Sequence, residues 1–239
     1  MRICPINAIS FKSAVQNDTQ SAKIKKSKEQ ENHPSLAYYG INSNVSLAQA
    51  AKLLNKNTVE KLMAKGVNII DPDNVWISPD TEIEAGTTIL PWVYIAGKNK
   101  IGKGCQIGPF SHLRGNVTIG DNVRIGNFVE VKNSTIKSNT NVSHLSYIGD
   151  SDIGSGVNIG AGTITANYNP YTKVKSRTVI KDGANTGSHS VLVAPVVMGE
   201  KSFLAAGSVA TKDIEPNALV LTRTRPTVIL NWVKKYTNL

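Results

Sequence analysis

Aliphatic residues recur every six positions through the middle of the chain. The regular run is Ile77, Ile83, Ile89, Ile95, Ile101, Ile107, Leu113, Ile119, Ile125 and Val131. The series continues with one-residue slips at Ile136, Val142, Ile148, Ile153 and Ile159, and resumes at Ile180, Thr186, Leu192, Met198, Leu204 and Ala210. A helix repeats its faces every 3.6 residues and a half-buried strand every two, so neither explains a period of six.

A period of six predicts short strands separated by turns, which is typical of a parallel β-helix built from hexapeptides. Each hexapeptide forms one side of a triangular coil. The aliphatic side chain points inward, and a small residue four positions later, such as Thr87 or Ser111, shares the narrow interior. A glycine often follows the aliphatic residue, where it permits a positive φ or a close backbone approach. About 21 hexapeptides predict about seven coils, roughly 34 Å long at the usual strand spacing.

The segment before the repeats divides into two parts. Residues 1–35 are polar and basic and predict a disordered tail, for which a solvated leader is favoured over a nucleic-acid or membrane contact. Residues 36–70 lead into the repeats and contain an apolar stripe of helical period. That stripe predicts a helix over 46–65, capped by Ser46 and ended by Gly66.

The β-helix domain is expected over residues 71–215, followed by a C-terminal segment over 216–239. A polar, basic loop at 165–177 interrupts the repeats and carries two tyrosines. Loops on a rigid scaffold often carry function, so this loop is a candidate ligand contact. Near the C-terminus, the pattern from Pro226 to Tyr236 predicts a short helix that caps the open end of the coils.

Composition fits a thin core and narrows the class of protein. Aromatic residues make up only 6% of the chain, as a narrow prism requires. The two cysteines exclude a disulfide framework and a cysteine zinc cluster, and the four histidines lack a metal-ligand spacing. No apolar run reaches the roughly 20 residues that a membrane span needs, and the first residues lack a signal-peptide pattern. A cytoplasmic protein without a metal is therefore expected.

The net charge of +10 suits anionic ligands. A nucleic-acid binder would be equally basic, but it needs basic residues interleaved with exposed aromatics along a continuous surface, which the predicted prism lacks. Arg114 and Lys132 are 18 residues apart, which is one full coil. We therefore expect the two cations to stack on one face, where they would suit a phosphate group. His144 follows twelve residues after Lys132, within reach of the same groove.

Several motifs occur in order along the repeats. They are Gly108-Pro-Phe-Ser-His-Leu-Arg114, Gly126-Asn-Phe-Val-Glu-Val-Lys132, His144-Leu-Ser-Tyr-Ile-Gly-Asp150, Asn158-Ile-Gly-Ala-Gly-Thr-Ile-Thr165 and Asn167-Tyr168. These segments closely resemble the C-terminal half of the bifunctional bacterial N-acetylglucosamine-1-phosphate uridyltransferase/glucosamine-1-phosphate N-acetyltransferase family. The resemblance covers about residues 40–225. The six-residue period is shared by many acyltransferases, whereas the last three of these blocks are far more specific.

The resemblance implies a left-handed β-helix that forms a homotrimer, with active sites between neighbouring prisms. The left hand is an exception to the usual right-handed crossover. The implied reaction moves the acetyl group of acetyl-CoA to the amine of glucosamine 1-phosphate, giving N-acetylglucosamine 1-phosphate for cell-wall precursors, without a metal. The family's base corresponds to His144. Its sugar-phosphate contacts correspond to Arg114, Lys132, Tyr147, Asn158 and Lys173, and its acetyl-CoA contacts to Ala161, Asn167, Tyr168, Ser188, Ala206 and Arg223.

The chemistry of these residue types agrees with acetyl transfer. A histidine suits the removal of a proton from an attacking amine near neutral pH. Backbone N–H groups of a glycine-rich coil, around Ala161, suit the oxyanion of the tetrahedral intermediate.

The sequence also departs from the family. The family's nucleotidyltransferase domain opens with a glycine-rich phosphate loop ending in an arginine, and nothing like it occurs here. We therefore expect uridylyl transfer to belong to a separate uridyltransferase. Some N-terminal coils are expected to be missing, Ser143 stands beside His144 where a glycine is usual, and Pro170 stiffens the loop.

Two alternatives remain open. One is an acyltransferase acting on another amino sugar or a nucleotide sugar, because a few groove contacts set sugar specificity. The other is a non-catalytic trimeric β-helix scaffold. A scaffold predicts loss of the groove residues, yet all of them are present.

Overall fold

The computed structural model describes residues 41–222 and 225–236. The predicted tail at 1–35 and Arg223 lie outside the described residues. The chain divides into two units, Met1–Ser35 and Leu36–Leu239, and only the second contains described residues.

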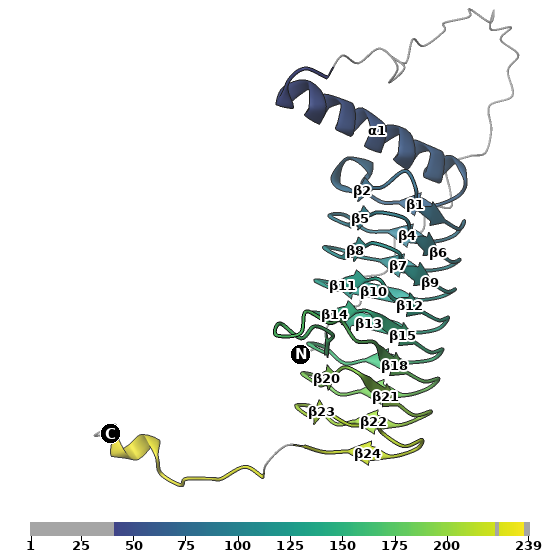
Figure 1. Cartoon of the computed structure of the whole chain (residues 1–239). Helices are drawn as coiled ribbons and strands as arrows, with labels where there is room; N and C mark the ends of the chain where they lie inside the picture. Colours follow the sequence, from purple (N-terminus) through teal and green to yellow (C-terminus); the bar gives the residue numbers. More distant parts are fainter. Residues whose placement is uncertain (1–40, 223–224, 237–239) are drawn as a thin grey trace, which may run out of the picture. The chain divides into compact units, whose positions relative to one another are not determined.

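Each strand pairs in parallel with the third strand along the chain, except that the last strand, β24, pairs with β22, and this pairing builds three flat sheets around a triangular coil (Figure 1). The first sheet has nine strands: β1 (Asn68–Ile69), β4 (Thr88–Ile89), β7 (Gln106–Ile107), β10 (Arg124–Asn127), β13 (Asn141–His144), β16 (Asn158–Ile159), β19 (Asn185–Thr186), β22 (Phe203–Leu204) and β24 (Leu219–Val220). The second has eight: β2 (Trp76–Ile77), β5 (Tyr94–Ala96), β8 (His112–Arg114), β11 (Glu130–Lys132), β14 (Tyr147–Gly149), β17 (Ile164–Ala166), β20 (Val191–Val193) and β23 (Val209–Ala210). The third has seven: β3 (Glu82–Ile83), β6 (Lys100–Ile101), β9 (Thr118–Ile119), β12 (Thr135–Ile136), β15 (Ser151–Ile153), β18 (Thr178–Ile180) and β21 (Val196–Met198).

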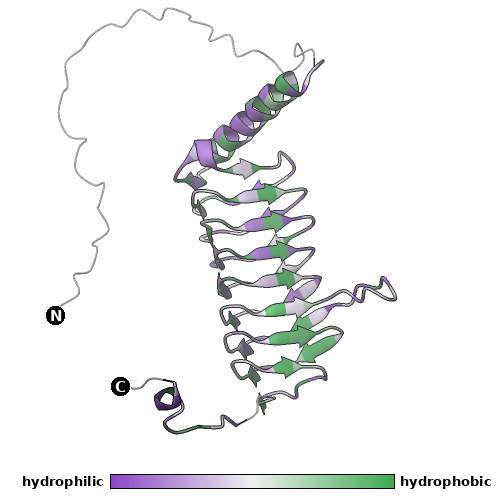
Figure 2. Ribbon diagram, turned by 90° about the vertical axis from the view of Figure 1, so that its left-hand side faces the viewer, coloured by the Kyte–Doolittle hydropathy of each residue, from purple (hydrophilic) through white to green (hydrophobic). Residues whose placement is uncertain are grey.

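The predicted left-handed β-helix is confirmed. The aliphatic residues of successive coils stack in register, as in the pairing of Ile107 with Ile125. Every residue of the hexapeptide series from Ile77 to Ala210 is buried, and Figure 2 shows these apolar positions recurring from coil to coil. The small residues four positions later are buried too. Their hydroxyls bond to the backbone: Ser111 Oγ donates to Gly126 O at 2.6 Å, and Ser208 Oγ accepts from Thr222 N at 3.2 Å. Polar groups in the narrow core thus have hydrogen-bond partners.

A helix covers the first coil. Helix α1 spans Asn44–Ala64, two residues earlier than expected at its start, because Ser43 and not Ser46 is the N-cap. Ser46 completes a capping box instead: its Oγ accepts from the Ser43 N–H, while Ser43 Oγ accepts from the Ser46 N–H at 3.1 Å. Gly66, with φ of +94°, follows the helix as predicted.

Asn55 joins α1 to the solenoid. Its Nδ2 donates to Val75 O and its Oδ1 accepts from Ile77 N, both at 2.9 Å. The single side chain thus bonds the backbone on either side of Trp76 in β2, the end strand of the second sheet. An uncovered end strand would expose these groups. A short 3₁₀ turn, η2 (Pro72–Asn74), lies between the helix and this strand.

The predicted C-terminal helix is wrong over most of its length. Only a 3₁₀ turn, η3 (Val233–Lys235), forms, and residues 225–236 are exposed. Val228, Ile229 and Trp232, the apolar residues of the expected capping helix, are therefore not buried. A helix this short is marginal without tertiary packing. Within 41–222 and 225–236, no helix is long and apolar enough to cross a membrane.

Candidate functional site

Arg114 and Lys132 occupy the same position of adjacent coils. Strand β11 pairs with β8 so that Lys132 lies opposite Arg114, which confirms the stacking predicted from their spacing. Glu130 lies beside them and accepts from Arg114 Nε at 2.5 Å. This hydrogen bond is the main reason that the pKa of Arg114 is raised above its ordinary value. Two cations thereby lie together on one outer face of the second sheet, and Glu130 holds the first of them.

These cations border a hollow of about 470 Å³ at the edge of the second sheet. Its lining consists of Arg114, Gly115, Asn116, Lys132, Asn133, Asp150 and Lys175. Three cationic side chains therefore surround a single carboxylate. Such a hollow suits an anionic ligand that can bind several cations at once.

Asp150 sits at the floor of this hollow and is only 5% exposed. Its Oδ1 accepts from Asn133 Nδ2 at 2.5 Å, and its Oδ2 accepts from Asn167 Nδ2. Burial alone would raise the pKa of Asp150, but the two amide hydrogen bonds, together with Lys132 and Lys175, lower it below its ordinary value. The carboxylate is thus held ionised and fixes the first loop residue, Asn167, to the coil.

Lys132 and Lys175 both line the hollow, and their amines lie close together. The pKa of Lys132 is lowered, first because the Lys175 amine lies against it and then because of partial burial. Arg114 acts in the same direction, while Asp150 opposes the shift. An anion bound here would relieve the repulsion between the two amines.

Tyr147 lies next to this group on β14. It pairs with Glu130, and its ring covers Gly149, where a Cβ would lie only 2.4 Å from the tyrosine hydroxyl oxygen. The hydroxyl also acts on the Arg114 guanidinium and contributes to its raised pKa. Glycine at position 149 is therefore needed to turn Tyr147 toward the cations.

His144 ends β13 at the corner between the first and second sheets and is exposed. It pairs with Asn127 one coil away, and its Nδ1 lies 2.9 Å from Asn127 Oδ1. The amide oxygen can only accept, so Nδ1 carries the proton and Nε2 is left as a base. Ser143 stands where the resemblance implies a glycine, and Gly126 opposite leaves room for its backbone, since a Cβ on Gly126 would lie 1.9 Å from Ser143 O.

Three predicted acetyl-CoA contacts fall in the same column as His144. Backbone hydrogen bonds connect the successive corners: Gly162 N to His144 O at 3.3 Å, His189 N to Ala161 O at 2.7 Å, and Gly207 N to Ser188 O at 2.8 Å. Ala161, Ser188 and Ala206 therefore follow His144 along one edge of the prism. We call this edge, from His144 to Ala206, the corner column.

The remaining predicted residues are not gathered in one place. Asn158 lies on β16 of the first sheet, between Asn141 and Asn185, and does not line the hollow beside Lys132. Asn167 and Tyr168 lie at the opposite edge of the second sheet from the corner column. Within one chain, the predicted contacts are thus divided between two sheets and two edges.

The loop between β17 and β18 projects from the coils as a short hairpin (Figure 2). Tyr168 and Lys175 form an antiparallel bridge, and Asn169 N bonds to Val174 O at 3.0 Å. The loop covers a second hollow of about 390 Å³, which Val193, Ala194 and Pro195 complete. Lys173, the loop cation expected from the resemblance, is exposed near the tip and lies outside both hollows.

Sequence reasoning missed Asn127, Asp150 and Asn133, whereas Lys175 was among the cations of the loop that was expected to contact an anionic ligand. The first two lie inside the quoted motifs, so their position was visible but their partners were not. Asn133 is brought to the hollow by the geometry of the coil, and Lys175 by the fold of the loop. Among the described residues, no group of histidine, cysteine and carboxylate side chains is arranged to hold a metal ion.

Comparison with known proteins agrees with this architecture. Residues 100–133 match the family described as bacterial transferase hexapeptide (six repeats). The chain is 40% identical, over 229 aligned residues, to the bifunctional protein GlmU of Fervidobacterium nodosum, and 42% identical, over 230, to GlmU of Thermodesulfovibrio yellowstonii. The chain is a hexapeptide-repeat relative of GlmU. Each alignment takes in 82% of this chain and 50% of the GlmU sequence, so the chain spans about half the length of the curated relatives it matches.

The predicted resemblance to the C-terminal half of GlmU is therefore confirmed. Among solved structures, a UDP-N-acetylglucosamine acyltransferase from Francisella novicida is similar at 17% identity and a TM-score of 0.48. That similarity covers 63% of this chain and 65% of the other.

Proposed function

We propose that the chain transfers the acetyl group of acetyl-CoA to the amine of glucosamine 1-phosphate. The observation that carries this proposal is the stack of Arg114 on Lys132 beside an anion-sized hollow, with the free Nε2 of His144 on the neighbouring corner. A phosphate needs the cations, and an amine nucleophile needs the base. The similarity to GlmU over most of the chain supports the same assignment.

The reaction moves one proton from the amine, by way of His144, to the leaving thiolate. The amine attacks the thioester carbonyl, the C–N bond forms, and His144 Nε2 takes the proton that the nitrogen loses. The C–S bond then breaks, and the proton passes to the departing thiolate, which leaves as coenzyme A. Backbone N–H groups around Ala161 are the candidates to stabilise the oxyanion.

In this proposal, acetyl-CoA lies along the corner column, which carries small side chains at Ala161, Ser188 and Ala206. Asn167, Tyr168 and Arg223 are the remaining proposed contacts. The sugar phosphate binds at Arg114, Lys132 and Tyr147, and Asn158 contacts the sugar from another face.

Two observations support a homotrimer with sites between prisms. The first is the division of the proposed contacts between separate faces, which a neighbouring copy would bring together. The second is an exposed aromatic ladder on the corner that precedes the second sheet. Trp92, Phe110 and Phe128 are each about half exposed, and their ring centroids are 6.3 and 5.3 Å apart. The rings stack on one another, so their edges remain for a protein neighbour to cover.

The first experiment measures release of free thiol from acetyl-CoA with glucosamine 1-phosphate, for the wild-type protein and for His144→Ala. Rapid release that the substitution lowers by a factor of roughly 10² to 10⁴ supports the reaction and the base. If thiol is released only with another amino sugar or a nucleotide sugar, the mechanism stands and the substrate is different. If the protein is a folded trimer but releases thiol with no amine, the scaffold alternative is correct.

A further inference from the structure

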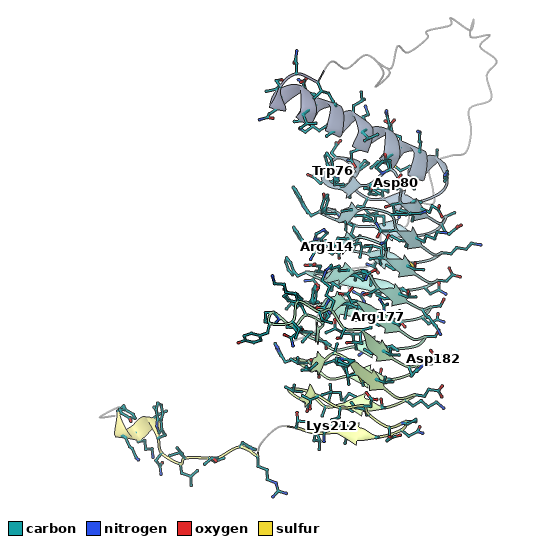
Figure 3. All side chains as sticks on the ribbon, in the orientation of Figure 1. Trp76, Asp80, Arg114, Arg177, Asp182 and Lys212 are labelled. Carbon is teal, nitrogen blue, oxygen red and sulfur yellow. The ribbon has the colours of Figure 1, made fainter. Side chains whose placement is uncertain are left out.

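His189 lies beside the corner column and is not one of the predicted contacts. It follows Ser188, and its backbone N–H donates to Ala161 O at 2.7 Å. Figure 3 labels Asp182, which lies at the preceding corner of the same coil. Four residues take equivalent left-handed positions at successive corners: Leu145, Gly162, His189 and Gly207, with φ values of +50°, +73°, +54° and +69°.

The His189 ring leans back over Gly162, toward the coil of His144. A Cβ built on Gly162 would lie 2.8 Å from His189 Nδ1 and 3.1 Å from Cε1. This edge of the ring therefore faces the Gly162 backbone, and Nε2 is the nitrogen farther from it. A side chain at position 162 would displace the ring, so the glycine is what allows the imidazole to lie here.

The ring is available to a ligand. His189 is exposed, and among the described residues its imidazole has no side-chain hydrogen-bond partner, whereas the His144 ring is bonded to Asn127. The equivalent corners on either side of His189 carry glycine, so the coil itself does not require a side chain at this position. An exposed imidazole held along one edge suits a hydrogen bond to a molecule that lies along that edge.

The position of the ring matches the chemistry of the proposed cosubstrate. Gly162 and His189 are one and two coils beyond the level of His144, so the ring lies about 5 to 10 Å from that level along the prism. Acetyl-CoA carries its thioester at the end of a pantetheine arm that contains two amides. Their carbonyl carbons are five and nine bonds from the reacting carbon, which is about 6 and 11 Å in an extended chain. With the thioester beside His144, the amides therefore reach the level of the His189 ring.

We propose that His189 binds the cosubstrate, with its Nε2 hydrogen-bonded to an amide of the pantetheine arm. Neutral imidazole can donate to the amide carbonyl or accept from the amide N–H, according to its tautomer. The inference rests on the proposed function for the identity of the cosubstrate, and its own claim is which side chain binds the arm. Because the arm does not change during the reaction, this bond lowers KM and leaves kcat alone.

The test compares His189→Gly with Lys201→Gly. Lys201 has a φ of +55° at a different corner, so glycine suits the backbone at both positions and either substitution removes one exposed side chain. We expect His189→Gly to raise KM for acetyl-CoA roughly 3- to 10-fold, as for one neutral hydrogen bond, with kcat within about twofold. Lys201→Gly should change neither constant. An unchanged KM in His189→Gly, or an equal rise in both variants, would overturn the proposal.

Two fragments of coenzyme A locate the contact. Pantetheine keeps the arm without the nucleotide, and adenosine 3′,5′-bisphosphate keeps the nucleotide phosphates without the arm. Each is measured as a competitive inhibitor against acetyl-CoA. His189→Gly should raise the inhibition constant of pantetheine by the same factor as KM for acetyl-CoA and leave that of the bisphosphate unchanged. The reverse pattern would place the ring on a phosphate and refute the contact with the arm.

Further outcomes separate this inference from an interface role and from the proposed function. Sedimentation should give the same oligomer for the wild-type protein and both variants, and an oligomer lost only in His189→Gly would make His189 an interface residue instead. A wild-type protein that transfers acetyl groups, with KM unaffected in His189→Gly, overturns the inference alone. A wild-type protein that neither binds coenzyme A nor transfers acetyl groups overturns the proposed function as well.

Discussion

Asn127 and His144 hold each other one coil apart, with 2.9 Å between the amide oxygen and Nδ1 of the imidazole. The two residues stack because the solenoid places them in register, 17 residues apart along the chain. Asn127 thereby favours the tautomer with the proton on Nδ1, which leaves Nε2 for the proposed role as base.

Replacement of Asn127 by alanine should therefore slow catalysis without weakening sugar binding. We expect kcat to fall about 10-fold or more, since a general base works only when its free nitrogen is aimed at the substrate. KM for glucosamine 1-phosphate should stay within about twofold. Steady-state kinetics test this, with Gln106→Ala, an exposed amide on the same sheet, as control. A normal kcat in Asn127→Ala would show that the ring is oriented by something else.

Asp150 should make the fold sensitive to acid. Its pKa is lowered from 3.8, so its stabilising contribution is complete above that pH and is lost as the pH falls through the lower, folded-state value. Asp150→Asn should cost roughly 1–3 kcal/mol of unfolding free energy at neutral pH. Thermal melts of both proteins between pH 7 and 2 should show this difference shrinking below about pH 4. A difference that stays constant over this range would contradict the role of the charge.

Arg114 should matter for binding and little for folding. Its ion pair with Glu130 leaves the side chains 46% and 34% exposed, so Arg114→Gln should change the unfolding free energy by less than about 1 kcal/mol. The KM for the sugar phosphate should rise roughly 10- to 100-fold. Urea titration and kinetics on the same preparation measure both. A large loss of stability would instead make Arg114 a structural residue.

The aromatic ladder can be removed without straining the coils. Phe110 and Phe128 have φ values of +54° and +56°, a region that asparagine tolerates better than most residues. The double variant Phe110→Asn, Phe128→Asn should keep its stability as a single chain within about 1 kcal/mol, while sedimentation shows monomers and acetyl transfer is lost. A trimer of unchanged affinity would exclude the ladder from the interface.

Asn55 should be required to close the first coil. Asn55→Ala removes both hydrogen bonds to the backbone around Trp76 and leaves the carbonyl of Val75 and the N–H of Ile77 without these partners. We expect a loss of roughly 1–3 kcal/mol in urea unfolding, with kcat unchanged because the site lies several coils away. Asn68→Ala, whose side chain makes only a 3.4 Å bond to Thr88, is the control.

The solenoid could be predicted from the sequence because one-dimensional folds repeat their contacts. Each inward residue, such as Ile107 or Ile125, meets only its equivalents in adjacent coils, so the period alone gives the register. The stack of Arg114 on Lys132 was predicted in the same way, from their separation of one full coil. The C-terminal helix failed because its apolar face needs a packing partner, and periodicity alone does not supply one.

The rest of the site depends on hydrogen bonds and backbone angles that the repeat period does not predict. Lys175 and Lys173 have the same charge, and only the loop hydrogen bonds and a left-handed φ distinguish them. The aromatic ladder was missed for a related reason: a thin core excludes large rings, but the left-handed corners accept Trp92, Phe110 and Phe128 on the outside.

Successive residues of the corner column lie one coil apart, whatever the number of residues between them in the chain. The chain uses 17 residues between His144 and Ala161, 27 between Ala161 and Ser188 and 18 between Ser188 and Ala206, yet each step advances by one coil. Three steps of about 4.8 Å give a fixed distance of about 14 Å from His144 to Ala206. Loops can lengthen at other corners without altering this distance, which changes only when a whole coil is gained or lost. The length of the loop and the length of the corner column can therefore evolve separately.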